Sequence, residues 1–436
     1  MSNSIGKYIQ LQGGFAFKSS DFRESGIPLI RISNVTENGL SKSDSVFLPD
    51  EFADELQDFL LNENDTLIAM SGATTGKCCL VKSTDMPGLI NQRVGRFRIL
   101  NEKETDKLFV YHVVSSTRFK DELLKDAFGS AQPNVSPKDI ENVIWDFPSF
   151  TEQKHIAKIL STADAVIEKT QAAIAKYKAI KQGILQDLFT RGIDLNTNKL
   201  RPRYQDAPEL YKESKLGMIP REWEEKIVDD IAKVNGRVGW KGYTVADLRD
   251  FGPLALGATH IDKENKLDLT NSIHLSMEKY IESPEIMVQF GDLLIVQRGT
   301  IGKIVVIDKQ IGEATINPSM VLLNSIRINN FFLYYQLCSF IGQLQIELLT
   351  TQTGVPMISQ EQIKNINLIV PKNPKETDAI AERLKNIDAI LDNEKSYLQK
   401  MQSLKKGLME DLLSGKVKVK SEKLEESEKL KAIREQ

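Results

Sequence analysis

The chain contains a long internal repeat, and this repeat constrains its possible folds more than any other feature. Two similar segments begin at Ile156 and Ile380 and align without a gap at an offset of 224 residues. The first is IAKILSTADAVIEKTQAAIAKYKAIKQGILQDLFT, and the second is IAERLKNIDAILDNEKSYLQKMQSLKKGLMEDLLS. Because similarity at a fixed offset indicates a repeated architecture, we interpret the chain as a tandem duplication.

The regions that precede these two segments also correspond, although more loosely. NDTLIAMSGATTGKCCLV matches GDLLIVQRGTIGKIVVI, and GSAQPNVSPKDIENVI matches QTGVPMISQEQIKNIN. Near the start of each half, Gly13, Phe17 and Lys18 match Gly236, Trp240 and Lys241. The order is the same in both halves, so each half is predicted to be a globular part followed by a long helix.

The repeated segments space their apolar residues alternately by four and three, which is typical of a coiled-coil seam and here lasts roughly five heptads. The matching phase and length favour pairing of the two helices with each other. The alternative is that each helix packs only on its own domain. The seam positions are Ile156, Leu160, Ile167, Ile174, Ile184 and Leu188 in the first helix, and Ile380, Leu384, Leu391, Leu398, Leu408 and Leu412 in the second.

Lys181 and Lys405 interrupt the seam at the same point of each helix. A polar residue in a seam often fixes the register of the helices at some cost in stability. Gly192 and Gly415 follow the repeated segments and are predicted to end the helices.

The globular parts combine both kinds of secondary structure. The segments DTLIAMS, CCLVKS, GRFRIL, DLLIVQR and KIVVID are predicted strands, because they are short, apolar and rich in β-branched residues. KLFVYHVVSSTRFKDELLKD and NFFLYYQLCSFIGQLQIELL are predicted to be helical. The fold class is therefore α+β. The predicted parts are a globular domain at 1–148, a helix at 149–192, a linker at 193–214, a second domain at 215–371, a second helix at 372–415 and a charged tail at 416–436.

Composition excludes few functions. The net charge of –3 is not the basic signature of a nucleic-acid binder, so any such function must rest on local features. Three cysteines without a CxxC pair and four histidines argue against a zinc site or a disulfide framework. The polar N-terminus and the absence of a long apolar run predict a cytoplasmic protein without a membrane span.

Two related domains joined by a rigid helical spacer could act as a ruler. The repeated helices have stayed alike, which suggests that they bind one partner twice. The domains have diverged, which suggests that they bind two different things.

The chain resembles the specificity subunits of type I restriction-modification systems over nearly its whole length. The residues that carry this resemblance are KLGMIPREWEEKIVDDIA at 215–232, GDLLIVQRGTIGK, the INQ and INP sites, and the TEQKHIAKIL entry into the helix. Each motif is weak alone, but their duplicated order is specific.

This resemblance implies that each domain recognises one half of a split, non-palindromic DNA target, and that the two long helices pair as an antiparallel coiled coil and set the spacer. Two modification subunits, which bind S-adenosylmethionine and methylate adenine, would dock on the chain. Restriction subunits, which use ATP and Mg²⁺, would join them. The chain itself would be present once per complex, with no cofactor, metal or catalytic residue of its own.

The residues agree independently with a non-catalytic role. An amino-methyltransferase needs an Asn/Asp-Pro-Pro-aromatic loop, and the nearest string, Asn317-Pro318-Ser319-Met320, lacks the second proline and the aromatic residue. No paired carboxylates suited to metal-dependent cleavage stand out.

Candidate DNA contacts are polar or aromatic residues in corresponding turns of the two domains, since Arg, Lys, Asn and Gln side chains read base edges. Arg96 and Arg98 share one face of a predicted strand. Plain turn chemistry, buried packing or a solvated edge is the alternative for each candidate. The candidates are Phe17, Lys18, Arg31, Asn34, Lys77, Arg93, Arg96 and Gln132 in the first half, and Trp240, Lys241, Thr259, His260, Arg298, Lys303, Gln352 and Thr353 in the second.

The segment SGATTGKCCL resembles a phosphate-binding loop of an NTPase, but it does not fit one. Only three residues separate Gly72 from Gly76, and Cys78 follows Lys77 where Ser or Thr is needed. Strands are predicted on both sides, whereas a phosphate loop leads into a helix. We interpret this loop and its copy at 298–307 as strand-turn-strand connections in which Lys77 or Lys303 meets a DNA phosphate.

Three other functions remain open at this point. The chain could be the specificity module of a related methyltransferase-nuclease system that is not type I. It could be a coiled-coil adaptor whose domains bind proteins or small ligands. The third function, an NTPase, rests on the Gly-Lys loop alone.

Overall fold

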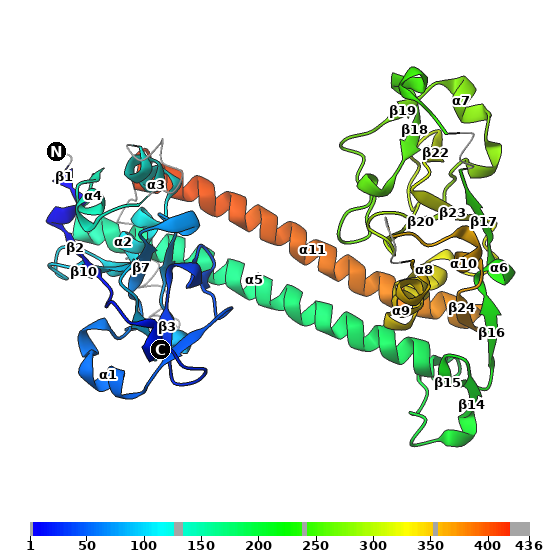
Figure 1. Cartoon of the computed structure of the whole chain (residues 1–436), viewed down its shortest axis with the longest axis horizontal. Helices are drawn as coiled ribbons and strands as arrows, with labels where there is room; N and C mark the ends of the chain where they lie inside the picture. Colours follow the sequence, from blue (N-terminus) through cyan, green and yellow to red (C-terminus); the bar gives the residue numbers. More distant parts are fainter. Residues whose placement is uncertain (1–2, 126–133, 238–241, 352–355, 419–436) are drawn as a thin grey trace, which may run out of the picture. The chain divides into compact units, whose positions relative to one another are not determined.

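The chain folds into two compact units, each with one mixed α/β domain and parts of both long helices (Figure 1). The units are Met1–Gln171 with Ser396–Gln436, and Ala172–Lys395. We call the α/β domain of the first unit the first head and that of the second unit the second head. The structure is a computed structural model, and it describes residues 3–125, 134–237, 242–351 and 356–418.

The first head contains two small sheets. The four-stranded antiparallel sheet has the order β2 (Ile9–Gly13), β10 (Val94–Ile99), β7 (Thr66–Ala69) and β8 (Cys78–Leu80). The three-stranded sheet has the order β6 (Val46–Leu48), β3 (Ile27–Ile30) and β9 (Leu89–Ile90), with β3 and β9 parallel. Two further pairs are β1 (Asn3–Ser4) with β11 (Ile144–Trp145), and β4 (Val35–Thr36) with β5 (Gly39–Leu40).

The second head repeats this topology, which confirms the internal duplication. Its four-stranded sheet has the order β17 (Lys233–Gly236), β23 (Met320–Asn324), β20 (Leu293–Val296) and β21 (Ile304–Val306). Its three-stranded sheet has the order β19 (His274–Leu275), β18 (Leu248–Leu256) and β22 (Ala314–Ile316), again with one parallel pair. The strands β16 (Trp223–Ile227) and β24 (Asn367–Pro371) pair as β1 and β11 do.

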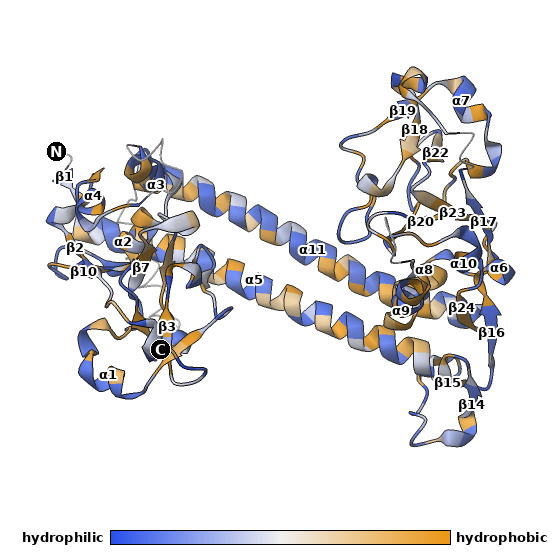
Figure 2. Ribbon diagram, in the orientation of Figure 1, coloured by the Kyte–Doolittle hydropathy of each residue, from blue (hydrophilic) through white to orange (hydrophobic). Residues whose placement is uncertain are grey.

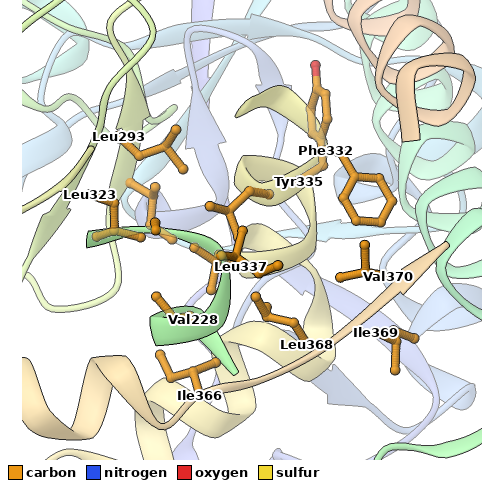
Figure 3. Close-up of a cluster of buried hydrophobic side chains, with 14 of the residues drawn as sticks. Val228, Leu293, Leu323, Phe332, Tyr335, Leu337, Ile366, Leu368, Ile369 and Val370 are labelled. Atoms are coloured by element: carbon orange, nitrogen blue, oxygen red, sulfur yellow. The ribbon is translucent and has the colours of Figure 1, made fainter. Parts of the chain in front are cut away.

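Strands β7 and β20 occupy equivalent inner positions of the two four-stranded sheets, and both are buried on both faces, which explains their continuous apolar sequences. In β20, Leu293 and Ile295 pack into one hydrophobic cluster, while Leu294 and Val296 pack into another. Figure 3 shows the first of these clusters, which contains Leu293 together with side chains from the helix that begins at Asn330 and from β24. The sheet is thus enclosed between two cores.

Each of the two predicted helical segments is divided into two helices by a serine. Ser116 separates α2 (Lys107–Val114) from α3 (Thr117–Leu124), and Ser339 separates α8 (Asn330–Cys338) from α9 (Phe340–Leu349). Both serines accept a hydrogen bond from a backbone amide of the following helix, which makes them N-caps. The short helices are α1 (Glu51–Glu55), α4 (Pro137–Glu141), α6 (Val228–Ile231), α7 (Met277–Ile281) and α10 (Gln360–Lys364).

The two long helices are continuous and end where the sequence predicts. Helix α5 (Phe150–Arg191) has 42 residues and α11 (Pro374–Leu413) has 40, so each is about 60 Å long at 1.5 Å per residue. Gly192 and Gly415 have φ angles of +66° and +72°, the left-handed conformation that commonly follows a helix. No helix among the described residues combines the length and apolar character of a membrane span.

The long helices pair in antiparallel orientation within each unit, as the fold prediction requires. In the first unit, Leu160 of α5 and Leu412 of α11 belong to one hydrophobic cluster. In the second unit, Leu188 shares a cluster with Ile380 and Leu384. Eight seam positions are buried, namely Ile156, Leu160, Ile174, Leu188, Ile380, Leu384, Leu391 and Leu412, while Ile167, Ile184, Leu398 and Leu408 are half-buried.

The two seam lysines form equivalent ion pairs across the helices. Lys405 Nζ lies 2.5 Å from Asp164 Oδ1 in the first unit, and Lys181 Nζ lies 2.5 Å from Asp388 Oδ1 in the second. Asp164 and Asp388 occupy the same position of the repeat, and so do the lysines. Each lysine therefore pairs with the aspartate of the other copy. Because the two copies of the repeat run antiparallel, the same ion pair forms twice.

A residue of each head lies beside the ion pair, but only in the second unit does it form a hydrogen bond with the pair. Tyr335 of α8 donates its hydroxyl to Asp388 Oδ2 at 2.7 Å. The equivalent residue in α2 is His112, whose Nε2 lies 3.0 Å from Ser161 Oγ. Burial, assisted by the charge of Lys405, lowers the pKa of His112 to about 3, although the Asp164 carboxylate lies 3.9 Å from Nδ1.

The first unit is therefore expected to lose stability in mild acid through His112. Between about pH 6.5 and pH 3 this histidine binds a proton in the unfolded chain but not in the folded one, so stability falls as the pH falls. The loss is about 1.4 kcal/mol per pH unit below about pH 6. Denaturant unfolding of the wild type and of His112→Gln at pH 7.5, 6.0 and 5.0 measures it. Parallel pH dependences for the two proteins would contradict the role of His112.

Residues 193–214, the predicted linker, contain β12 (Ile193–Asp194), β13 (Lys199–Leu200) and β14 (Tyr211–Ser214), which pairs with β15 (Gly217–Pro220). The buried carboxylate of Glu376, in the first turn of α11, connects this segment to the helices. Its Oε1 accepts hydrogen bonds from Ile193 N at 2.8 Å, Arg201 Nη1 at 2.5 Å and Trp223 Nε1 at 3.2 Å. A Cβ atom at Gly192 would lie 2.3 Å from Glu376 Oε1, so only glycine fits there.

Candidate nucleic-acid interface

Several turns that are distant in sequence meet at one edge of the first head. Met70, just after β7, donates its backbone N–H to Arg93 O at 3.0 Å, which joins the Gly-Lys turn to the β9–β10 turn. Thr74 Oγ1 in the Gly-Lys turn donates to Ile32 O at 3.0 Å. Asn134 forms a β-bridge with Ser71 at the same place. Most described candidates of the first head thus belong to loops that this edge brings together; we call it the turn edge.

The second head has the same edge, built from the corresponding loops. Gln297 donates its backbone N–H to Ser319 O at 2.9 Å, as Met70 does to Arg93. Ala258 donates its N–H to Ser319 Oγ at 3.1 Å, and Arg298 forms a β-bridge with Met357. The two edges are therefore equivalent in backbone, and they differ in the side chains that they present.

Phe17 lies in an aromatic cluster, while its neighbour Lys18 is exposed. The ring centroid of Phe15 lies 5.1 Å from that of Phe17 and 5.5 Å from that of Phe59. A Cβ atom at Gly14 would lie 2.2 Å from Asn91 O, so glycine allows this loop to approach the β9–β10 turn. Packing accounts for Phe17, and Lys18 is free to face a DNA phosphate.

Asn34 and His260 are buried residues that stabilise a turn. The prediction that they read bases does not fit these positions. Asn34 Oδ1 accepts the backbone N–H of Arg31 at 2.9 Å, and His260 Nδ1 accepts that of Gly257 at 3.0 Å. The two side chains differ in type but close the same turn in the two heads, so their difference does not reflect target reading. Of the other two candidates in these turns, Arg31 donates a hydrogen bond from Nη2 to Asp44 O at 2.5 Å. Thr259 is exposed.

Arg96 is also a structural residue, and the prediction that it contacts DNA does not fit its position. Its side chain is 0% exposed. The guanidinium donates to Asp65 Oδ2 at 2.9 Å, to Gln12 Oε1 at 2.8 Å and to Leu60 O at 2.5 Å. Burial lowers its pKa, and the Asp65 carboxylate opposes that effect. All donors of this arginine face protein acceptors, so none is available to a base.

The second head lacks this ion pair. Leu322 replaces Arg96 on the equivalent strand, and Asp292 replaces Asp65. Asp292 Oδ2 accepts the backbone N–H of Gln289 at 2.8 Å, and burial raises the pKa of its carboxyl to about 6. In place of an arginine, the hydrogen bond that the structure gives to this carboxyl comes from a backbone N–H group.

The Gly-Lys loops are strand-turn-strand connections, as the sequence predicts. They join β7 to β8 and β20 to β21, and their four glycines have positive φ angles between +79° and +83°. Lys303 Nζ donates to Ile261 O at 2.9 Å, so a backbone carbonyl holds its ammonium. The half-buried Lys77 has no such bond among those that the structure defines. The phosphate-contact prediction therefore fits Lys77 better than Lys303.

Arg93 and Arg298 are exposed at the turn edges of the first and second heads. Five candidates, Gln132, Trp240, Lys241, Gln352 and Thr353, lie outside the described residues. The partners of the seam lysines, Asp164 and Asp388, were not predicted, although aspartate stands at the same position in both copies of the repeat.

Comparison with known proteins gives a consistent result for both halves of the chain. The family model of the type I restriction modification DNA specificity domain matches residues 3–177 and 220–403. The chain is 26% identical over 422 residues to the type I restriction enzyme MjaVIII specificity subunit of Methanocaldococcus jannaschii, covering 94% of this chain and 88% of that protein. It is 22% identical over 402 residues to the EcoBI specificity subunit of Escherichia coli, covering 89% and 79%.

A solved structure with a similar fold covers nearly the whole chain. This is the S subunit of a type I restriction-modification system from M. genitalium, with a TM-score of 0.61 and 16% sequence identity. The similarity spans 95% of this chain and 96% of that one, so the duplicated fold with two long helices is shared.

Proposed function

The chain belongs to the family of type I restriction-modification DNA specificity subunits, the non-catalytic components that recognise the DNA target, and on that premise we propose that its two heads read the two halves of a split target. In this family the cofactors reside on the partner modification and restriction subunits. The turn edges of the two heads support the proposal most directly. They share one backbone design but present different exposed side chains, so they would recognise two different, non-palindromic half-sites.

The long helices are proposed to set the spacer between the half-sites. Two helices of 42 and 40 residues resist bending better than a loop of the same length. The two ion pairs, Lys181–Asp388 and Lys405–Asp164, support a single register, because a slip of either helix would separate four partly buried charges.

A second apolar stripe on the helices supports the docking of partner subunits. Ile390, Tyr397 and Leu404 of α11 recur every seven residues, are 42%, 47% and 50% exposed, and lie outside the seam. The equivalent positions of α5 are also apolar: Val166 and Ala173 are half-buried, and Ile180 is 38% exposed. Hydrophilic residues alternate with apolar ones along both long helices (Figure 2). An apolar position beside the seam is typical of helices in larger bundles. Because the same three positions are apolar in both helices, we propose two modification subunits on one copy of this chain.

Shortening both helices by one heptad tests the spacer proposal. Deleting 173–179 and 397–403 keeps the seam phase and both ion pairs but removes about 10 Å of helix. We expect a spacer shorter by up to about three base pairs, at 3.4 Å per pair, with unchanged half-sites. Sequencing of methylated sites in a host that expresses the chain with its modification subunit measures this.

Shortening only one helix is the control. It moves Asp164 and Lys405, or Lys181 and Asp388, out of register, so methylation should be lost. An unchanged spacer in the doubly shortened chain would contradict the proposal.

A further inference from the structure

The arginines of the first head differ in whether the guanidinium group has a partner within the protein. Arg96 is fully buried, and Arg98 donates to Gln12 Oε1 at 2.8 Å and to Asp58 O at 3.2 Å. Arg23 and Arg31 donate to backbone carbonyls, and Arg118 lies over the ring of Trp145 at 4.6 Å. Within the described part of this head, Arg93 remains exposed, and the structure gives its guanidinium no such partner.

The backbone beneath Arg93 is firmly held. Asn91 N donates to Ile30 O at 3.0 Å, and Val94 N donates to Asn91 O at 2.8 Å. The carbonyl of Arg93 itself accepts from Met70 N. Because the backbone of this turn is already fixed, less backbone freedom is lost when the exposed guanidinium binds an external ligand.

The second head also exposes an arginine at its turn edge, but on the other turn. Arg298 lies at the end of β20, where its backbone pairs with Met357. Its Nε lies 3.1 Å from Met357 Sδ, which steadies the side chain. No described acceptor within hydrogen-bond distance is assigned to its two terminal nitrogens, the atoms that reach the edge of a base.

The two arginines occupy different, neighbouring positions of equivalent edges. At the position where one head has arginine, the other head has serine. Arg93 corresponds to Ser319, whose Oγ lies 2.6 Å from Asn317 Oδ1. Arg298 corresponds to Ser71, which is buried. A short hydroxyl that is buried or bonded internally cannot reach a base that an arginine reaches. Because the arginine stands at different positions of the two edges, the two heads can contact different positions of the DNA.

We propose that Arg93 and Arg298 are the guanine-reading residues of the first and second heads, and that they read different positions of their respective half-sites. This inference rests on the proposed function of the heads. Arginine forms two parallel hydrogen bonds with O6 and N7 of guanine, a geometry that no other base offers. Each half-site would then contain a guanine whose recognition depends on one arginine.

The direct test replaces each arginine by serine, the residue at the equivalent position of the other head. Arg93→Ser, Arg298→Ser and the double variant are expressed as full chains with the modification subunit, and methylated sites are sequenced. Arg93→Ser should relax one G·C position of one half-site, with discrimination lower by roughly tenfold to hundredfold. Arg298→Ser should relax one position of the other half-site, and the double variant should show both changes.

Lysine substitutions and thermal unfolding serve as controls. Arg93→Lys and Arg298→Lys keep the charge but not the paired donors, so base preference should weaken while overall methylation is better preserved. Melting temperatures should be unchanged, because both side chains are exposed.

Three results would overturn the inference: an unchanged motif, relaxation of the same half-site by both variants, or a uniform decrease of methylation that indicates phosphate contacts. If the wild type itself methylates no bipartite target, the proposed function fails instead.

Discussion

Replacement of Glu376 by alanine is expected to destabilise the second unit by about 3–5 kcal/mol, the cost of removing one partner of a buried ion pair. The substitution leaves the guanidinium of Arg201 without its buried carboxylate and leaves the N–H groups of Ile193 and Trp223 without an acceptor. Trp223 is fully buried beside the substituted residue, so its fluorescence in a urea titration should report the loss.

The duplication provides a matched control for this substitution. Glu152 occupies the position of Glu376 in the first copy, but among the described residues its carboxylate accepts hydrogen bonds from the backbone and hydroxyl of Ser149 alone, at 3.1 and 2.7 Å. Glu152→Ala should therefore cost about 1 kcal/mol, the usual value for a helix cap. Equal losses for the two variants would contradict the structural role of the Glu376 network.

Replacement of Arg96 by leucine, the residue of the second head, is expected to destabilise the first unit by a similar amount, about 3–5 kcal/mol. The carboxylate of Asp65 would lose its buried partner, and Leu60 O would lose a donor. The DNA sequence that the surviving protein recognises should not change, because the guanidinium faces the protein interior. Urea unfolding and sequencing of methylated sites test the two parts separately.

A second substitution at Asp65 sharpens this test. In Arg96→Leu/Asp65→Asn the unpaired charge is removed, while the asparagine can still accept the backbone N–H of Asn62, as Asp65 does at 2.9 Å. Part of the lost stability should return. A variant of Arg96 that keeps its stability but methylates a different motif would restore the original assignment of Arg96 as a DNA contact.

The repeat predicted the architecture well because its signals are local. Heptad spacing, helix-ending glycines and short apolar strands depend on residues close in the sequence, so α5, α11 and the strands around the Gly-Lys turns could be identified. The serine breaks between α2 and α3 and between α8 and α9 are also local. They were missed because the apolar pattern continues across Ser116 and Ser339.

The candidate DNA contacts were harder to predict, because residue type alone does not reveal what a side chain contacts. Asn34 and His260 looked like divergent base-reading residues, yet both close the same turn. Arg96 alternates with apolar residues in a strand that the sequence could place at a solvated edge. In the structure β10 lies between β2 and β7, and segment 58–65 covers that face.

The sequence by itself determined that the protein has two copies of one domain, two long helices with a common seam, and a lysine at the same point of each seam. These properties follow from short-range periodicity and backbone preference. Only the tertiary structure decided which polar groups the protein uses internally and which it leaves exposed. The guanidinium of Arg96 finds its acceptors 31 and 84 residues away in the chain, whereas that of Arg93 finds none among the described residues. Burial and hydrogen-bond partners arise from segments distant in sequence, and no local pattern encodes them.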